Sequence, residues 1–158
     1  MKKLVLLTIL LLGFQTISFA QKTKVTVDDD TIKVNEIPYA ILDKSAGLGF
    51  DFKVKNLEGK DLFFLKFLDF NNPSRITNGN PKGRVTYFEA TFFNDGKKCE
   101  VDATGGKKSV AKMIVENELV LNNAVNEQAE NTFVLINGMK FTEERNNMNN
   151  GNIIIIQR

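Results

Sequence analysis

The stretch DLFFLKFLDF, residues 61–70, decides the fold of this chain. Side chains of a strand alternate between its two faces, and here both alternating sets are apolar. One set is Leu62, Phe64, Leu68 and Phe70, and the other is Phe63, Leu65 and Phe67. Apolar residues on both faces are typical of a strand that is covered on two sides, so we expect residues 61–70 to lie in the centre of a sheet.

Segments on both sides of this central strand show the alternation of half-exposed strands. Before it come a hairpin over residues 25–34 and strands over 37–43 and 50–55, and after it come strands over 84–94 and 97–103. Short polar turns such as Asn94-Asp95-Gly96 join several of these segments, and such turns connect antiparallel strands. The run Ile153–Ile156 is entirely β-branched and predicts a closing strand.

Residues 109–138 form the one long stretch with helical spacing. Val110 and Ile114 mark the apolar stripe of a first helix, and Asn126 can cap a second helix that Gly138 ends. We expect Val110, Ile114, Phe133 and Ile136 to form a lid on the sheet. The fold class predicted is α+β: a mostly antiparallel, curved sheet of about seven or eight strands, with two short consecutive helices packed on one face or end.

The N-terminus has the pattern of a secretory signal peptide. Lys2 and Lys3 precede an apolar run, Leu4–Leu12, and the small residues Ser18 and Ala20 stand three and one positions before the expected cut. A membrane anchor is the alternative, but this run is much shorter than the roughly 20 residues that span a bilayer. We therefore expect cleavage after Ala20, a single globular domain over residues 21–158 that does not span a membrane, and a periplasmic or secreted location.

The charge of the mature chain argues against nucleic-acid binding. The full chain has 21 basic and 19 acidic residues, and removal of Lys2 and Lys3 leaves 19 of each. Proteins that bind phosphate backbones normally carry a basic excess. The second predicted helix also begins with Glu127 and Glu130, which would face phosphate in a recognition helix. We therefore predict that nucleic acid is not a partner.

Much common catalytic chemistry is missing from the sequence. The chain has no histidine, which removes Ser-His-Asp catalysis and nearly all zinc sites, and it has no glycine-rich phosphate loop. A pair of carboxylates of the glycosidase type is the alternative, although the chain also lacks the tryptophan that usually lines such clefts. We predict a protein that is not an enzyme, with no catalytic residue, no cofactor and no metal site.

The acidic run Asp28–Asp30 and the single cysteine have structural explanations. A calcium loop that began at Asp28 would need glycine at its sixth position, where Lys33 stands, so a hairpin turn is favoured. Asp30-Thr31-Ile32 resembles the tripeptide that some Gram-negative bacteria O-glycosylate, which makes Thr31 a candidate acceptor. Cys99 alternates with Val101 and is expected to face inward as a small apolar residue. An intermolecular disulfide is the alternative.

Two candidate binding regions are suggested by the aromatic content and by the longest loop. The chain has 13 Phe, most of them between Phe50 and Phe93, and these either build the core or line an apolar cavity. We place such a cavity behind Phe64 and Phe88, with Tyr87 beside it. The other region is the loop 71–83, where the cationic residues are Arg75, Lys82 and Arg84 at its end.

Three stretches of the chain also show a resemblance. They are VNEIPYA (34–40), VKNLEGKDL (54–62) and the helical region 108–138. In this order they resemble a family of small, uncharacterised exported proteins of Gram-negative bacteria, described as hypothetical proteins. The chain departs from the family pattern at Asn35-Glu36, where a turn glycine is expected. The resemblance implies an exported globular domain and assigns no catalytic residue.

Together these observations predict an exported, non-enzymatic, β-rich domain that binds an unknown protein or a small apolar ligand in the cell envelope or outside the cell. One alternative is a structural protein that pairs through its C-terminal strand, for example as a homodimer. A second alternative is a carrier of apolar ligands such as lipids.

Overall fold

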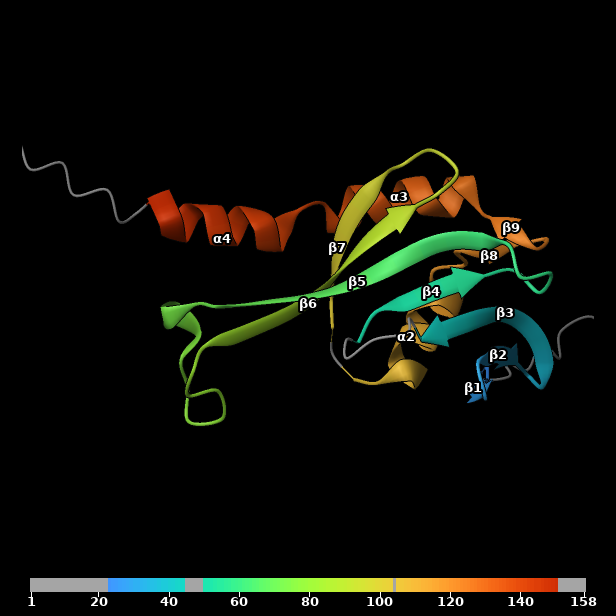
Figure 1. Cartoon of the computed structure of the whole chain (residues 1–158), viewed down its shortest axis with the longest axis horizontal. Coiled ribbons are helices and arrows are strands. Elements are labelled where there is room, and N and C mark those ends of the chain that lie inside the picture. The colour runs from blue at the N-terminus through green and yellow to red at the C-terminus, as the bar shows by residue number, and fades with distance from the viewer. Residues whose placement is uncertain (1–22, 45–49, 104, 151–158) are drawn as a thin grey trace, which may run out of the picture.

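The computed structural model describes residues 23–44, 50–103 and 105–150. Its main element is a seven-stranded antiparallel sheet in which each strand pairs with the next one along the chain (Figure 1). The strands are β1 (Val25–Asp28), β2 (Thr31–Val34), β3 (Ile37–Lys44), β4 (Phe52–Lys55), β5 (Asp61–Asn71), β6 (Arg84–Phe92) and β7 (Lys98–Asp102). The predicted strands up to residue 103 are therefore confirmed, and β5 is indeed an inner strand of the sheet.

Three helices come after the sheet in the sequence. They are α2 (Lys107–Glu116), α3 (Glu127–Asn137) and α4 (Lys140–Asn150), with a small hairpin of β8 (Val120–Leu121) and β9 (Ala124–Val125) between the first two. The Asn126 side chain accepts a hydrogen bond from the Ala129 N–H and caps α3, as predicted. Gly138 ends α3 with a φ of 52°, and α4 continues from this point, so α3 and α4 form one bent helix. The α+β prediction is confirmed, whereas α4 was not predicted.

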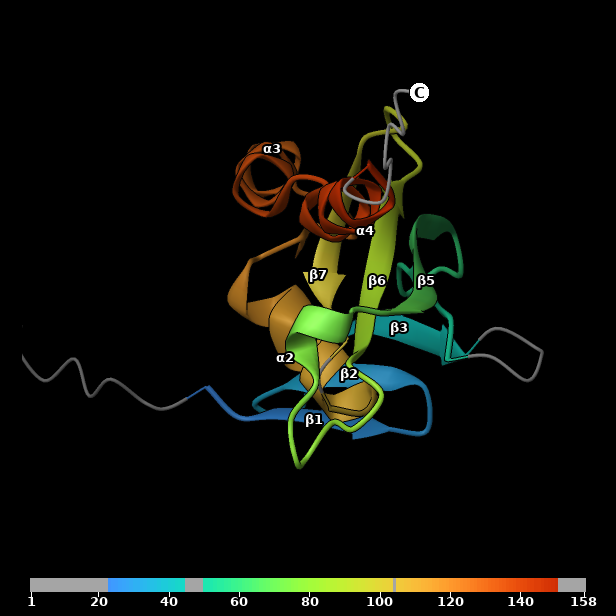
Figure 2. The same ribbon diagram turned by 90° about the vertical axis from the view of Figure 1, so that its left-hand side faces the viewer.

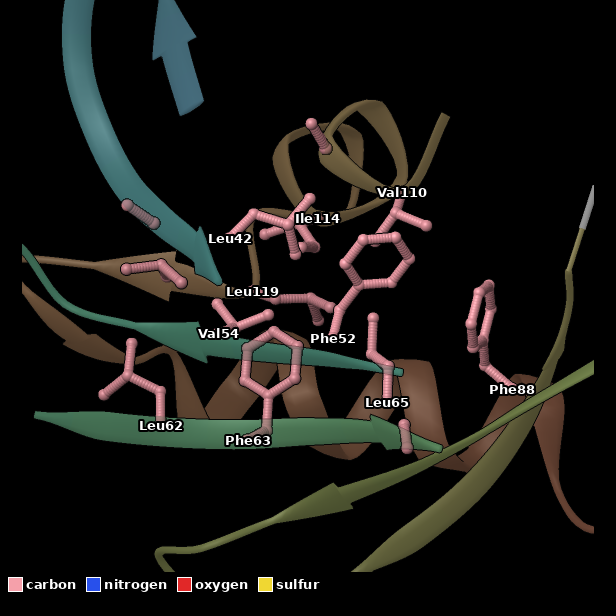
Figure 3. Close-up of a cluster of buried hydrophobic side chains, with 14 of the residues drawn as sticks. Leu42, Phe52, Val54, Leu62, Phe63, Leu65, Phe88, Val110, Ile114 and Leu119 are labelled. Atoms are coloured by element: carbon pink, nitrogen blue, oxygen red, sulfur yellow. The ribbon is translucent and has the colours of Figure 1, made fainter. Parts of the chain in front are cut away.

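The sheet is strongly curved around α2. Figure 2 shows β1 and β2 running across the direction of β6 and β7, with α2 inside the bend. Val110, Ala111 and Ile114 of α2 are buried there against strand residues such as Phe63 and Leu65. Figure 3 shows side chains of β3, β4 and β5 gathered beneath this helix. Burial of these apolar side chains on the concave face is the main source of stability for the fold.

A hydroxyl group ties the β8–β9 hairpin to this core. The Tyr39 hydroxyl donates to the Val120 carbonyl at 2.6 Å and accepts from the Val120 N–H at 3.2 Å. Partial burial of the ring raises the pKa of Tyr39 above its usual value, which keeps the hydroxyl protonated as a donor. Tyr39 therefore connects β3 with the segment that comes after α2.

The convex face of the sheet carries a second, smaller apolar cluster under α4. Its buried members are Val85 and Tyr87 of β6 and Phe141 of α4, and Leu68 and Phe70 of β5 pack against them. Tyr87 stacks on Phe141 with ring centroids 4.8 Å apart. β5 is thus covered on both faces over part of its length, while its Lys66 and Asp69 are exposed.

The bent helix also covers the free edge of β7. The N–H of Glu100 donates to the Gly138 carbonyl at 2.8 Å, which satisfies an outward-facing strand amide. The Glu100 carboxylate is fully buried and accepts hydrogen bonds from the N–H groups of Phe141 and Thr142 and from the Thr142 hydroxyl. A β7 side chain therefore caps the first turn of α4.

Two details of the predicted lid and turns differ from expectation. Val110, Ile114 and Phe133 are buried as predicted, but Ile136 is 75% exposed, so its assignment to the lid is wrong. α3 is rotated so that Glu130 faces inward with Phe133, and the Glu130 carboxylate accepts a hydrogen bond from the Asn94 amide at 2.7 Å. The β2–β3 turn forms without the expected glycine, because Asn35 and Glu36 both take the positive φ that this turn requires.

Two predictions fall outside the described residues. The signal peptide over residues 1–20 and the closing strand at Ile153–Ile156 both lie there, so each stays a prediction. In the described ranges, no helix is long and apolar enough to cross a membrane.

Candidate functional site

An open hollow on the concave face of the sheet is lined by four phenylalanine side chains. Phe52 comes from β4, Phe67 from β5 and Phe88 from β6, while Phe50 precedes β4. Their rings form a continuous series, with centroids 5.3 Å apart for Phe50–Phe67, 5.7 Å for Phe67–Phe88 and 5.9 Å for Phe52–Phe88. The hollow has a volume of 380 Å³, and we refer to it as the phenylalanine pocket.

The pocket forms because neighbouring strands differ in length. β4 pairs with β5 only from Asp61 to Leu65, so Phe67 lies beyond the point where β4 begins. Phe67 and Phe88 are direct cross-strand partners and point to the same face. The Asp51 carboxylate accepts from the Phe67 N–H at 2.7 Å and takes the place of a strand partner there. Figure 3 shows Phe52 and Phe88 at the end of the core nearest Val110.

Small residues complete the opposite wall of the pocket. Ala103 comes directly after β7, and Gly105 and Gly106 lead into α2. Their short or absent side chains leave the space unfilled next to the rings. Gly105 has a φ of 84°, a conformation that favours glycine, so the backbone itself selects a residue without a side chain at this point.

The charged groups that line the phenylalanine pocket are two lysines. The Lys44 ammonium lies 5.8 Å from the centroid of the Phe50 ring, at the mouth of the pocket. The Lys107 ammonium donates to the Asp30 carboxylate and to the Asp29 carbonyl. Of the residues that the structure describes, no acid lines the pocket. The mouth of the pocket is therefore positively charged. Its charge comes mainly from Lys44, because Lys107 is paired with Asp30.

The structure separates the three residues of the predicted cavity. Phe88 lines the phenylalanine pocket, but Phe64 and Tyr87 lie in the opposite phase of their strands and point to the convex face. Phe64 is half-buried, and Tyr87 is fully buried in the small cluster under α4. Phe52 and Phe67 were not predicted as partners of Phe88. Alternation places Phe67 on one face of its strand, but only the strand register shows which residues it meets.

The cations of the predicted binding loop serve the structure of the loop. Arg75 makes a two-pronged ion pair with Glu144 of α4, with contacts of 2.8 and 2.7 Å. The Arg84 guanidinium contacts the Asp69 carboxylate at 2.9 Å. Lys82 is exposed and makes no ion pair within the described ranges. The structure thus uses Arg75 and Arg84 to hold the loop against α4 and β5.

The same loop has a well-defined backbone. A 3₁₀ turn, η1 (Pro73–Arg75), is capped by the Asn72 side chain, which accepts from the Ser74 N–H at 2.9 Å. Gly83 has a φ of 59°, and a Cβ atom there would overlap the Asn72 carbonyl oxygen. The Asn72 side chain also donates to Glu144, so the loop and α4 share one polar network.

The acidic turn and the candidate glycosylation residue lie at the first hairpin. Asp28 pairs with Lys33, Asp30 pairs with Lys107, and Asp29 occupies the turn with a φ of 51°. No group of three or more potential metal ligands occurs in the described part of the chain. Thr31 is the half-buried first residue of β2, and its modification stays a prediction.

Two buried ionisable groups lie away from the phenylalanine pocket. Cys99 is fully buried as expected, and burial raises the pKa of its thiol to about 12, which makes it a poor nucleophile. Burial also raises the pKa of Glu130 above its usual value, and one of its carboxylate oxygens has no hydrogen-bond partner among the described residues. Neither group is placed to act on a ligand in the pocket.

A second hollow lies between the β4–β5 turn and the β8–β9 hairpin, and most of the residues that line it are polar. It has a volume of 440 Å³ and is lined by several asparagines, including Asn56 and Asn123. These amides are used within the fold: the Asn56 side chain donates to the Asn123 carbonyl at 3.0 Å, and the Asn123 side chain accepts from the Leu57 N–H at 2.8 Å. The polar hollow is therefore a junction between two turns.

Comparison of the chain with protein family models, with curated proteins and with solved structures gives no match. The resemblance to exported proteins of Gram-negative bacteria therefore stays an expectation. The geometry of the phenylalanine pocket makes it the strongest candidate for a binding site in the described part of the chain.

Proposed function

We propose that this protein binds a small molecule with an apolar body in the phenylalanine pocket and catalyses no reaction. The observation that carries the proposal is the series of four Phe rings around an open volume of 380 Å³. Ligand pockets commonly have volumes of roughly 300–1,000 Å³ and are lined mainly by apolar and aromatic side chains. The export signal proposed at residues 1–20 would place this binding in the periplasm or outside the cell.

The exposure of the rings supports a binding role over a purely structural one. Phe52 and Phe88 are almost completely buried, but Phe50 is 60% exposed and Phe67 is only half-buried. Phe50 contacts Phe67, and Phe67 contacts Phe88, so one apolar surface runs from the core of the protein to the mouth of the pocket. A ligand that covers Phe50 and Phe67 would remove this apolar area from water, which is favourable by about 25 cal/mol per Å².

A fluorescence titration with a blocked pocket tests the proposal. The neutral probe N-phenyl-1-naphthylamine becomes bright in apolar sites, and the chain has no tryptophan to interfere with the signal. Ala103→Phe fills the pocket, and Ala124→Phe adds the same ring at an exposed position of β9 as a matched control. We expect the wild type and the control to bind the probe equally and Ala103→Phe to bind at least about tenfold more weakly. Equal binding by all three proteins contradicts the proposal.

Pairing through Ile153–Ile156 and binding of a protein partner stay predictions, since the described residues carry no observation that favours either.

A further inference from the structure

We propose that the ligand is an amphipathic carboxylate, such as a fatty acid, whose apolar chain lies among the Phe rings while its carboxylate pairs with Lys44. This inference rests on the proposed function and names the chemical class of the ligand. Three features of the pocket support it: the sign of the lining charges, the place of these charges relative to the rings, and the other contacts that they make.

The charge at the mouth has a single sign. The lining residues that carry charge are Lys44 and Lys107, and both are basic. A group of Phe rings alone would suit a cation, because the ring faces attract positive charge. Here the Lys44 ammonium already occupies that position, 5.8 Å from the Phe50 ring centroid, and repels a second cation. The lining thus disfavours a cationic ligand and favours an anionic one.

Lys44 is also available to a ligand. The other lysine that lines the pocket, Lys107, has a carboxylate partner, because it contacts Asp30. Lys44 is exposed and has no acidic partner within the ranges that the structure describes. An ammonium without a partner, beside an apolar surface, gains most from a ligand that brings its own negative charge.

The opposite wall adds to the positive field. The first residues of α2 lie there, and Gly106 at the N-cap offers no side chain to accept hydrogen bonds from the helix amides. The positive end of the helix therefore adds to the field of Lys44 at the mouth, whereas the charge of Lys107 is offset by Asp30. The buried rings lie farther inside the pocket than Lys44. A ligand with a charged head and an apolar tail therefore matches both the mouth and the interior of the pocket.

The experiment compares three ligands that share one alkyl chain and differ in head group. Octanoate, 1-octanol and octyltrimethylammonium are titrated into the purified mature protein by isothermal titration calorimetry. We expect octanoate to bind at least about tenfold more tightly than octanol, and the cation to bind most weakly. Extension of the carboxylate chain should raise affinity by about fourfold for each methylene that the pocket accepts.

Two lysine variants locate the head group. Lys44→Gln removes the charge at the mouth, whereas Lys66→Gln removes an exposed charge from β5 on the convex face. We expect Lys44→Gln to lose the preference for octanoate over octanol while octanol affinity is unchanged, and Lys66→Gln to behave as the wild type. Higher salt should weaken octanoate binding and leave octanol binding unaffected.

The possible outcomes separate this inference from the function on which it rests. Equal affinity of the wild type for octanoate and octanol overturns the carboxylate assignment and leaves the apolar pocket standing. A preference for octanoate that survives Lys44→Gln overturns the role of Lys44. If none of the three ligands binds, and Ala103→Phe also leaves the fluorescence titration unchanged, both the inference and the proposed function are wrong.

Discussion

The concave and convex faces of strands β5–β7 are both covered by helices, but by different kinds of contact. On the concave face, α2 packs through the apolar residues Val110, Ala111 and Ile114 onto a large core. On the convex face, Phe141 is the apolar side chain of α4 that is buried, among those that the structure describes. α4 is otherwise held by polar contacts, chiefly the Glu100 cap and the ion pair between Arg75 and Glu144.

The two helices are held differently because their sequences place different kinds of side chain against the sheet. Apolar burial depends on area, so a helix that packs this way needs a regular apolar stripe. A helix that is held by caps and ion pairs needs only a few residues at fixed places, and these come from distant parts of the chain. We therefore expect the concave face to contribute more to stability than the convex face, so substitutions on the two faces should differ in cost.

The largest effect is expected on the concave face. Ile114→Ala removes a fully buried side chain beneath α2 and should lower the free energy of unfolding by about 3 kcal/mol. Urea denaturation measures the change. Leu135→Ala on α3 is the control, because Leu135 is 84% exposed and its loss should have little effect. A loss smaller than that of Glu100→Ala on the convex side would reverse the order of the two faces.

An intermediate effect is expected where β7 meets α4. Glu100→Ala leaves the N–H groups of Phe141 and Thr142 without their acceptor and should cost about 2 kcal/mol. Hydrogen exchange should increase in α4 and remain slow in β5 and β6, because the loss is local. Glu143→Ala, at an exposed position of the same helix turn, is the control. Uniformly faster exchange across the sheet would show that the cap supports the whole fold.

The smallest effects are expected at two tyrosines that lie on opposite faces of the sheet. Tyr39→Phe removes two hydrogen bonds to Val120 and should cost about 1 kcal/mol. Tyr87→Phe removes a buried hydroxyl that has no partner among the described residues, so the free energy of unfolding should stay equal or rise. Thermal unfolding of both variants checks the pair. A lower melting temperature for Tyr87→Phe would reveal a partner for its hydroxyl.

The sequence predicts those parts of the fold that depend on periodic patterns. Alternation indicated the strands of the main sheet, and helical spacing with Asn126 and Gly138 indicated the bounds of α3. α4 escaped prediction because KFTEERNNMNN has almost no apolar stripe, and its anchor Glu100 stands about forty residues earlier in the chain. The buried Glu130 escaped for a similar reason: its hydrogen-bond partner, Asn94, belongs to a distant turn.

The phenylalanine pocket was only partly accessible from the sequence. The concentration of Phe in the central strands suggested an apolar cavity, and Phe88 does line one. The residues that surround Phe88 depend on strand register and on the fact that β5 pairs with β4 only as far as Leu65. Neither feature can be recognised in the local sequence. The long loop was predicted as a binding region because it carries Arg75 and Arg84. These cations pair with Glu144 and Asp69, which shows why charge in a loop is weak evidence for binding.

The contact between the Gly138 carbonyl and the Glu100 amide has a consequence for association between molecules. An uncovered strand edge can template the addition of strands from other chains and so start fibril growth. At β7 the bent helix occupies this edge, so a second chain cannot add there without displacing α3 and α4. At the other end of the described sheet, β1 has only four residues and ends in Asp28. Short, charged edges make poor templates, so the two ends of the sheet protect the protein from fibril formation in different ways.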